Sequence, residues 1–377
     1  MKFRKNFGRD WSMPLGQPPT LRDIANAAGV SLATVSAALN DKNGVSPQTR
    51  TRILDIAASL GYEIKEKKRV AEETDLRVIG FLVKHDLDMV RGANPFYSHV
   101  QFGANNFCQR HNISLMVATM DVDISNHPLS WPAMINQNQI DGLIMAGAFI
   151  DDSVEILKRK MDFPIVLVDS YSSTLDCDSI VTDNVGGAKK AVQHLVQNGH
   201  ERIGLAGWNP FSPPSIQLRQ QGYLRVLDAY GLKPFIVETE LSRAGGQKAA
   251  AKLLANRQVT ALFCCNDETA LGAISAIREM GLSVPGDVSV VGFDNIDLAA
   301  EISPALTTVH VQKSWMGALG VQALIDRVRN PDKPQTTVVV ATDLVIRESV
   351  ACIGQPDPQK QRAGELALAT AYQNILP

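Results

Sequence analysis

The sequence predicts a small N-terminal all-α domain of the helix-turn-helix type, followed by an α/β core of two parallel-sheet subdomains. Three observations predict this organisation. Residues 20–62 carry three short amphipathic patterns separated by turn signals, as helices do. From residue 76 onward, short β-branched runs alternate with helical patterns, which is typical of βαβ units. The chain has 377 residues, a length that fits two or three domains.

Composition narrows the class of protein. A hydrophobic share of 45% and a charged share of 20% are those of a soluble globular protein, which excludes a disordered or collagen-like chain. No apolar run reaches the roughly 18 residues that span a bilayer, and residues 1–19 contain no apolar signal region. We therefore expect a cytoplasmic protein with no membrane partner. Five cysteines, two of them adjacent at Cys264 and Cys265, indicate buried thiols, and we expect neither a metal nor a cofactor.

Charge is distributed unevenly along the chain. Residues 1–70 hold 12 basic and 6 acidic side chains, a net charge of +6, whereas the remainder holds 25 and 33, a net charge of −8. The asymmetry indicates either a small basic module that suits a polyanionic partner, or chance with a basic tail. Residues 1–19 themselves are expected to be a disordered extension, or an over-called start with Met13 as initiator.

Three helices are predicted in order within residues 20–62. Thr20 is a good N-cap for the first helix, and Gly29-Val30 forms a tight turn after it. Ser31 then caps a second helix, and Ser46 followed by proline starts a third, which stops at Gly61. The apolar positions of these patterns are Leu21, Ile24, Ala25, Ala28, Val35, Ala38, Leu39, Ile53, Leu54, Ala57 and Leu60.

A three-helix bundle without a nucleic-acid role would show the same helical patterns. The exact sequence of these residues distinguishes the two possibilities. TLRDIANAAGVSLATVSAALN and VSPQTRTRILDIAASLGY closely resemble the DNA-binding head of the lactose/galactose repressor family. This resemblance covers about forty residues and implies that residues 20–62 bind DNA through a helix-turn-helix.

The resemblance assigns base contacts in the major groove to Leu32 and Ala33, at the start of the second helix. Ala37 stands where many members have an arginine that reads a base. Because alanine offers only apolar contact, for instance to a thymine methyl, either these side chains read an apolar feature or DNA shape contributes to specificity. The remaining residues expected at the DNA, most of them as phosphate contacts, are Thr20, Leu21, Ser31, Thr34, Ser36, Asn40, Ser46 and Thr49.

Residues 63–76 are expected to form a hinge or linker. Family members often have a proline, an asparagine and an alanine here, followed by a leucine that wedges into the minor groove. In this chain Ile64, Lys65 and Lys68 replace the first three and Ala71 the leucine, so we do not expect a full wedge. Basic residues including Lys68 and Arg69 can still bind phosphates, and a solvated linker is an equal alternative.

The resemblance extends along residues 77–350, through strings such as DNVGGAKKAVQHLVQNGHERIGLAG and FCCNDETALGAISAIREMGLSVPGDVSVVGFDN. It implies an effector-binding core similar to the sugar-binding proteins of the bacterial periplasm, with a cleft at the carboxyl ends of the strands. The expected first lobe is 77–169 plus 298–326, the second is 170–297 plus 327–350, and the chain crosses three times. Residues 351–377 form a tail with a weak helical stretch at 363–372.

Arg219, Asn266 and Asp294 match family positions that hydrogen-bond the effector, in the strings RQQGY, CCND and GFDN. Arginine supplies a fork of donors and aspartate a pair of acceptors, which suits a polyhydroxylated ligand. We therefore expect a small-molecule effector, a carbohydrate in the first instance. A surface ion pair, a helix cap or a turn is the alternative role for each residue.

Aromatic residues are expected to give the effector stacking faces. Phe96 and Tyr97 follow the first predicted strand, and Trp208 or Phe211 follows a later one. The alternative is that these rings belong to the core. His200 is expected to be a loop histidine with a structural hydrogen bond, and Asp183-Asn184 to start a helix near the cleft.

The function implied by the resemblance is that of a ligand-responsive transcription factor, more often a repressor, that binds a pseudo-palindromic operator as a homodimer. A solute-binding protein is the second possibility, but the sequence has the head and no signal region. An α/β enzyme is the third, but no Ser-His-Asp order, paired catalytic carboxylates or GxxxxGK string is present.

Overall fold

The computed structural model describes residues 19–39, 45–60, 62, 76–86, 95–123, 127–147, 151–172, 175–255, 259–354 and 358–373. The predictions for residues 1–18, for Asn40 and for linker residues 63–75, including Lys68 and Arg69, lie outside these ranges. The chain divides into two compact units, residues 1–72 and 73–377, and each is described here by itself. No helix in the described ranges is long and apolar enough to cross a membrane.

The first unit is a three-helix domain, called the head below. Its helices are α1 (Leu21–Ala28), α2 (Leu32–Leu39) and α3 (Pro47–Ser59). Ile24, Val35 and Ile53, one from each helix, are fully buried against one another in a small core. Leu54 was expected among the apolar core positions, but it is 37% exposed, because it lies next to Ile53 and so points away from that core.

The predicted helix starts are present. Thr20 and Asp23 form a capping box on α1, in which the Thr20 Oγ1 accepts from the Asp23 N–H and the Asp23 carboxylate accepts from the Thr20 N–H. Gly29 ends α1 in a left-handed conformation with φ 64°. Ser46 caps α3 by accepting from the Thr49 N–H. These local signals confirm the helix-turn-helix prediction.

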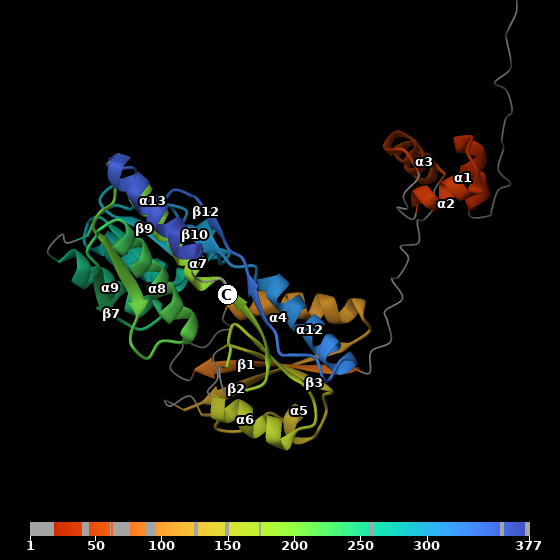
Figure 1. Ribbon diagram of the computed structural model, residues 1–377, viewed down its shortest axis with the longest axis horizontal. Coiled ribbons are helices and arrows are strands. Elements are labelled where there is room, and N and C mark those ends of the chain that lie inside the picture. The colour runs from red at the N-terminus through yellow and green to blue at the C-terminus, as the bar shows by residue number, and fades with distance from the viewer. Residues whose placement is uncertain are drawn as a thin grey trace, which may run out of the picture. The chain divides into compact units, whose positions relative to one another are not determined.

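The second unit contains two six-stranded sheets, which define two lobes. Lobe one holds the sheet with strand order β11-β5-β4-β3-β1-β2, in which every neighbouring pair is parallel. Its strands are β1 (Val78–Asp86), β2 (Ser114–Val122), β3 (Gly142–Ala146), β4 (Ile165–Val168), β5 (Asp178–Thr182) and β11 (Thr337–Val340). Figure 1 shows α4 (Pro95–Arg110) and α12 (Lys313–Arg329) on one face of this sheet, with α5 (Ala133–Asn136) and α6 (Asp151–Lys160) on the other.

Lobe two holds the sheet with strand order β12-β10-β9-β8-β6-β7, parallel except for the pair β10–β12. Its strands are β6 (Ile203–Trp208), β7 (Phe235–Glu238), β8 (Ala261–Cys264), β9 (Ser289–Asp294), β10 (Thr307–His310) and β12 (Asp343–Val345). Its helices are α7 (Asn184–Gln197), α8 (Pro214–Ala229), α9 (Arg243–Leu254), α10 (Asp267–Glu279), α11 (Leu298–Glu301) and α13 (Pro358–Gln373).

The strand orders correct the expected lobe limits. Strand β5, expected in lobe two, pairs in parallel with β4 of lobe one, and β10, expected in lobe one, pairs with β9 of lobe two. Strand β11, expected in lobe two, pairs with β5 of lobe one. The chain therefore passes between the sheets after β5, after β10 and after β11. Each of the three crossings lies one strand later than expected, because backbone pairing, which the apolar runs do not encode, decides to which sheet a strand belongs.

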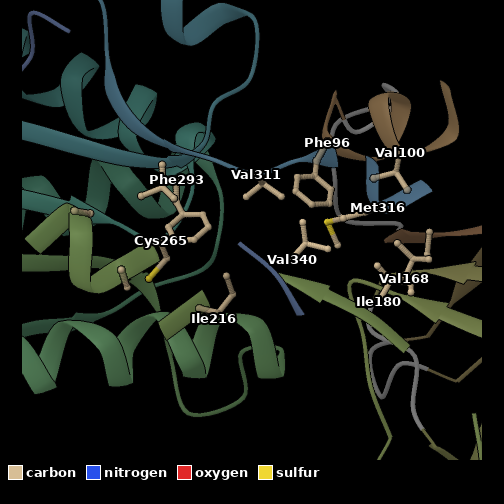
Figure 2. Packing of buried hydrophobic residues seen from close by; sticks show 14 of the residues in the cluster. Phe96, Val100, Val168, Ile180, Ile216, Cys265, Phe293, Val311, Met316 and Val340 are labelled. Atoms are coloured by element: carbon tan, nitrogen blue, oxygen red, sulfur yellow. The ribbon is translucent and has the colours of Figure 1, made fainter. Parts of the chain in front are cut away.

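One apolar cluster continues from lobe to lobe through the crossing segments. Figure 2 shows Phe293 on the side of lobe two, Val168 on the side of lobe one, and Val311 and Val340 between them. Both valines lie at crossings and are nearly or fully buried. The lobes are thus joined by packed side chains as well as by the chain itself.

Two expectations about single residues are confirmed. Asp183 caps α7, since its side chain accepts from the Gly186 N–H. His200 is buried, with its ring nitrogens 3.0 Å from the Thr260 Oγ1 and 3.1 Å from the Ala351 carbonyl oxygen.

The cysteines and the tail differ somewhat from expectation. All five cysteines are free thiols; four are buried as expected, but Cys352 is exposed. The weak helical stretch in the tail is the longer helix α13, which packs on α8 and buries Leu368 in the core cluster.

Candidate functional site

The head presents an apolar surface at the first turn of α2. Leu32 is 48% exposed and Ala33 is exposed, whereas Ala37, one turn later, is half-buried. None of these three side chains has a hydrogen-bonding atom, so this face can contact bases only through apolar groups. Ser36 and Leu21, also expected at the DNA, are half-buried.

Hydroxyl groups lie at the starts of α2 and α3. The Ser31 Oγ accepts from the Thr34 N–H at 3.1 Å and lies 2.8 Å from the Thr34 Oγ1. Ser46 and Thr49 repeat the arrangement on α3, at 3.2 and 2.8 Å. Helix N-termini with nearby hydroxyls favour phosphate oxygens. The structure therefore gives Ser31 and Ser46 a local role as caps, and both remain exposed.

The described part of the head carries little net charge. Its charged residues are Arg22, Arg50, Arg52, Asp23 and Asp55. Arg52 is partly engaged inside the domain, because its Nη2 donates to the Ala28 carbonyl oxygen at 3.0 Å. Nine of the twelve basic residues of positions 1–70 therefore lie outside the described ranges.

A buried polar cluster lies at the carboxyl ends of the strands of lobe two. Arg219 on α8 is 3% exposed, and its Nε donates to the Asn184 Oδ1 at 2.9 Å. Its Nη1 donates to the Cys265 carbonyl oxygen at 2.6 Å and lies 3.1 Å from the Asp294 Oδ1. The guanidinium also stacks over the Phe293 ring, 3.7 Å from the centroid. Arg219 thus has partners on several sides, with Asp294 as its ionic partner.

Asp294 lies at the end of β9 in an unusual backbone conformation. Its φ is 109°, a region that residues with a side chain rarely adopt. Burial raises the pKa of its carboxyl, and the positive charges of Arg219 and Lys313 oppose that rise. The Oδ1 has no hydrogen-bond partner among the described residues, although Arg219 is close enough for an ion pair. A hydroxyl donor from a ligand would satisfy it.

On the side of lobe one, Tyr97 and Asp169 form a second polar pair. The Tyr97 hydroxyl donates to the Asp169 Oδ2 at 3.0 Å, and Phe96 packs edge-on against the Tyr97 ring at 5.1 Å. Burial raises the pKa of Asp169 to about 6. The enclosed Asp169 Oδ1 has no hydrogen-bond partner within the described part of the chain. Phe96 is buried in the core cluster, so its alternative role as a core residue fits the structure better.

Asn266 and Asp267 start α10 and are engaged inside lobe two. The Asn266 Oδ1 caps α10 by accepting from the Thr269 N–H at 2.9 Å. Asp267 is fully buried, and its carboxylate accepts from the Ile296 N–H at 2.8 Å and the Thr308 Oγ1 at 2.5 Å. Burial, with Asp294 nearby, raises the pKa of Asp267 to about 8. The cap is the alternative role that the sequence left open for Asn266.

Trp208 and Phe211 are placed differently from one another. Trp208 is half-buried and donates its Nε1 hydrogen to the Gln217 Oε1 at 2.8 Å. Phe211 is 96% exposed and stands free of the core. Only the Trp208 ring is therefore fixed in position by its neighbours.

A cavity of about 200 Å³ lies between residues of the two lobes. It is lined by Asp169, Ser170, Tyr171, Val181, Asn184, Pro214, Ser215, Leu218 and Thr337. Two of the expected site residues lie behind this lining, because Tyr97 donates to Asp169 and Arg219 donates to Asn184. Asp169 was not among the expected site residues, and Asn184 was expected only as a helix start near the cleft. Asp169 directly follows β4 and Asn184 lies two residues after β5, and these positions at strand ends were the signal that could have found both.

Comparison with known proteins covers most of the chain. Residues 20–65 match the family described as bacterial regulatory proteins, lacI family, and residues 192–350 match a periplasmic binding protein-like domain. The ribose operon repressor of Haemophilus influenzae is 32% identical over 335 residues, covering 88% of this chain and 98% of that protein.

Two solved structures have the same fold. A LacI family transcriptional regulator from Enterococcus faecium with bound ribose has a TM-score of 0.63 and 28% identity, covering 74% of this chain and 100% of that one. The lac repressor dimer bound to operator and the anti-inducer ONPF has a TM-score of 0.62 and 25% identity, covering 89% and 100%.

Proposed function

The chain belongs to the lacI family of bacterial regulatory proteins, and from this premise we propose how it represses transcription. A homodimer binds a pseudo-palindromic operator through its two heads, and a small-molecule effector, a sugar or sugar derivative, changes the operator affinity. The protein acts in the cytoplasm on the nucleoid. One observation carries this proposal. The same chain contains a head with an exposed apolar helix start and a two-lobed core with a buried arginine–aspartate cluster.

The polar groups near the cavity support a polyhydroxylated effector. Asp169 and Asp294 each offer an acceptor oxygen, and Arg219 brings donors to the same region. Hydroxyl groups that donate to the carboxylates would satisfy these acceptors without bringing a further charge into the site. The names of two relatives refer to ribose, which makes D-ribose the first probe.

Exposed apolar side chains on lobe one support dimer formation. Phe102 on α4 is 59% exposed and Val117 on β2 is 42% exposed, and α4 packs against β2. β2 is an edge strand of its sheet. A second copy of the chain would cover these side chains, and a two-fold dimer matches the symmetry of a pseudo-palindromic site. Sedimentation of Phe102→Glu beside the parent protein tests this surface.

The experiment that tests the function begins with selection of DNA sites by the full chain from a random pool. Affinity for a selected site and for its scrambled version is then measured by fluorescence anisotropy at fixed salt, with and without each ligand. The ligands are D-ribose, other sugars, glycosides, sugar acids and nucleobases. A bound ligand at one hundred times its Kd adds about 2.7 kcal/mol of stability, which a thermal-shift screen detects.

A matched pair of leucine variants locates the DNA contact. Leu32 and Leu54 are both exposed, at 48% and 37%, on different helices of the head. Leu32→Ser should remove the preference for the selected site, whereas Leu54→Ser should keep it. Equal affinity of the parent protein for selected and scrambled DNA would contradict the proposed function.

The two other classes of function are less well supported. The relatives that match 88% of the chain are named as repressors, which favours a regulator over an enzyme. A solute-binding protein would have no use for the head, which matches the regulatory family.

A further inference from the structure

The second crossing between the lobes carries a buried lysine. Lys313 is the first residue of α12 and is only 5% exposed. Its Nζ donates to the backbone carbonyl oxygens of Asp294 and Asn295, the latter at 3.0 Å. α12 packs on α4 and on strands of lobe one, whereas Asp294 ends β9 of lobe two. The ammonium group therefore joins a helix of one lobe to a turn of the other.

The turn that accepts these bonds has a strained backbone. Asp294 has a φ of 109° and Asn295 a φ of 50°, two consecutive residues with positive φ and side chains. Such conformations persist only where surrounding groups hold them. Because both carbonyl oxygens accept from the same ammonium, Lys313 helps to fix the orientation of this turn and hence the direction of the Asp294 carboxylate.

The other groups that bond to Asn295 belong to lobe two. The Arg347 Nη2 donates to the Asn295 Oδ1 at 2.8 Å, and the Asn295 amide nitrogen lies 2.9 Å from the His310 Nδ1. The Asn295 N–H donates to the Thr308 Oγ1 at 3.3 Å. Among the described residues that bond to the turn, Lys313 is the one that belongs to a helix of lobe one.

We propose that Lys313 is a positioning residue that couples the arrangement of the lobes to the Asp294 carboxylate. Separation of the lobes withdraws the ammonium from the two carbonyls and releases the turn. Conversely, a ligand that holds Asp294 in its present place favours the lobe arrangement in which Lys313 reaches it, as linkage requires. The regulatory meaning of this coupling rests on the proposed function, but the coupling itself is a property of the free protein.

A merely structural role is the alternative. Burial lowers the pKa of Lys313, while the negative charges of Asp294, Asp267 and Asp297 oppose that shift. These acidic groups would stabilise the ammonium group whether or not it couples the lobes. If Lys313 only stabilises the fold, its replacement should lower the melting temperature without changing the distance between the lobes. The distance between lobes is therefore the readout that separates the two roles.

The experiment measures that distance by electron–electron double resonance on the full chain, without DNA or effector. One nitroxide label is attached to the native Cys352, which is exposed and lies in lobe two, where the neighbouring Ile353 N–H donates to the Asn198 carbonyl oxygen. The second is attached to Ile156→Cys on α6 of lobe one, a position 54% exposed. The other four cysteines are buried and should not react.

Lys313→Met removes the donor and keeps the apolar stem. Loss of charge-assisted hydrogen bonds should raise the population of separated lobes roughly tenfold, seen as a second distance. Lys313→Arg should restore the parent distance. Lys189→Met is the matched control, because Lys189 is also buried, at 7% exposure, but lies on α7 of lobe two.

An unchanged distance distribution in Lys313→Met would overturn the proposal. Should that variant not fold, Lys313→Gln takes its place, and failure of both to fold would assign Lys313 to the structural core and also overturn it. Because no DNA or effector is present, this result is independent of the operator experiment, so failure of the coupling and failure of the proposed function are distinguishable.

Discussion

Side-chain chemistry at the start of α2 determines what the head can read. Leu32, Ala33 and Ala37 offer only aliphatic groups. Ala37→Arg would add a planar fork of donors one turn from the exposed pair, where guanine can accept it. We expect preference to shift toward guanine at one operator position, by about 1–3 kcal/mol. Site selection with both proteins measures this, and an identical set of selected sites would show that this face does not meet the bases.

The buried partners of Arg219 define a second prediction. Arg219→Ala leaves Asp294 buried without its ionic partner, which should lower the free energy of unfolding by about 3–5 kcal/mol. In the double variant Arg219→Met with Asp294→Asn no buried charge is left unpaired, so part of the loss should be recovered. Urea unfolding of the single variants Arg219→Met and Asp294→Asn and of the double variant gives the coupling energy. Strictly additive losses would mean that the two groups act independently.

The burial of His200 should make the free energy of unfolding depend on pH. Burial lowers the pKa of His200 to about 4, below the 6.5 of an unperturbed histidine. Since the unfolded chain then binds the proton more readily, the stability contributed at neutral pH is lost as the pH falls from 6.5 toward 4, by up to about 3 kcal/mol. In His200→Gln this part of the pH dependence should disappear.

The His200 comparison uses the difference between variant and parent at each pH. The pKa of Asp267 is raised to about 8, so its effect on stability has the opposite pH dependence. The stability that Asp267 contributes is lost as the pH rises between about 4 and 8. It is common to both proteins and cancels. His127→Gln, at a mostly exposed side chain, is the matched control. Equal acid sensitivity in His200→Gln and the parent would exclude this role for His200.

Local rules found the residues whose partners are close in sequence. Thr20, Ser46 and Asp183 cap helices through the third residue after them, and the sequence predicted all three helix starts. The same rule accounts for the cap that Asn266 forms on α10. The resemblance alone would have assigned the Asn266 side chain to the effector. By contrast, the bond from Arg219 to the Cys265 carbonyl joins residues 46 positions apart, and no local pattern predicts it.

At the scale of elements, the alternation of strand and helix was predictable, but the sheet membership of each strand was not. Strand β5 reads as an apolar run like its neighbours, and nothing in its residues distinguishes pairing with β4 from the start of a new sheet. The crossings are determined by backbone hydrogen bonds between distant segments. For the same reason the cavity lining, drawn from the segment after β4 and from β5, α7, α8 and β11, could not be assembled from sequence.

The C-terminal helix α13 packs closely on lobe two at Gly364. A Cβ added at Gly364 would lie 2.7 Å from atoms of the Tyr230 ring, which closes the gap between α13 and lobe two. Gly364→Val should therefore detach α13 while the sheets stay folded, since most of the core cluster lies elsewhere. Hydrogen exchange should show α13 amides losing protection.

A control for that variant lies ten residues earlier in the chain. A Cβ added at Gly354 meets nothing within 4 Å, so Gly354→Ala should leave the exchange of α13 unchanged. If α13 stays protected in Gly364→Val, the Tyr230 contact does not hold the helix. Digestion near residue 357 that rises only in Gly364→Val would give the same answer by an independent measurement.

For the whole molecule, the position of positive charge decides how DNA binding depends on salt. The described part of the head holds three arginines and two aspartates, whereas Lys2, Arg4, Lys5 and Arg9 lie in the N-terminal segment. Replacement of those four by serine should reduce the slope of log K against log salt by about 0.9 for each phosphate contact that is lost.

That replacement should weaken binding to selected and scrambled DNA by the same factor, because phosphate contacts carry no sequence information. Anisotropy titrations between about 50 and 200 mM salt span the range in which such contacts change affinity most visibly. Lys248 and Lys252, on α9 of lobe two, replaced together by serine, are the control and should not change the slope. A slope that stays at the parent value in the fourfold variant would place the phosphate contacts on the capped helix starts and the linker instead.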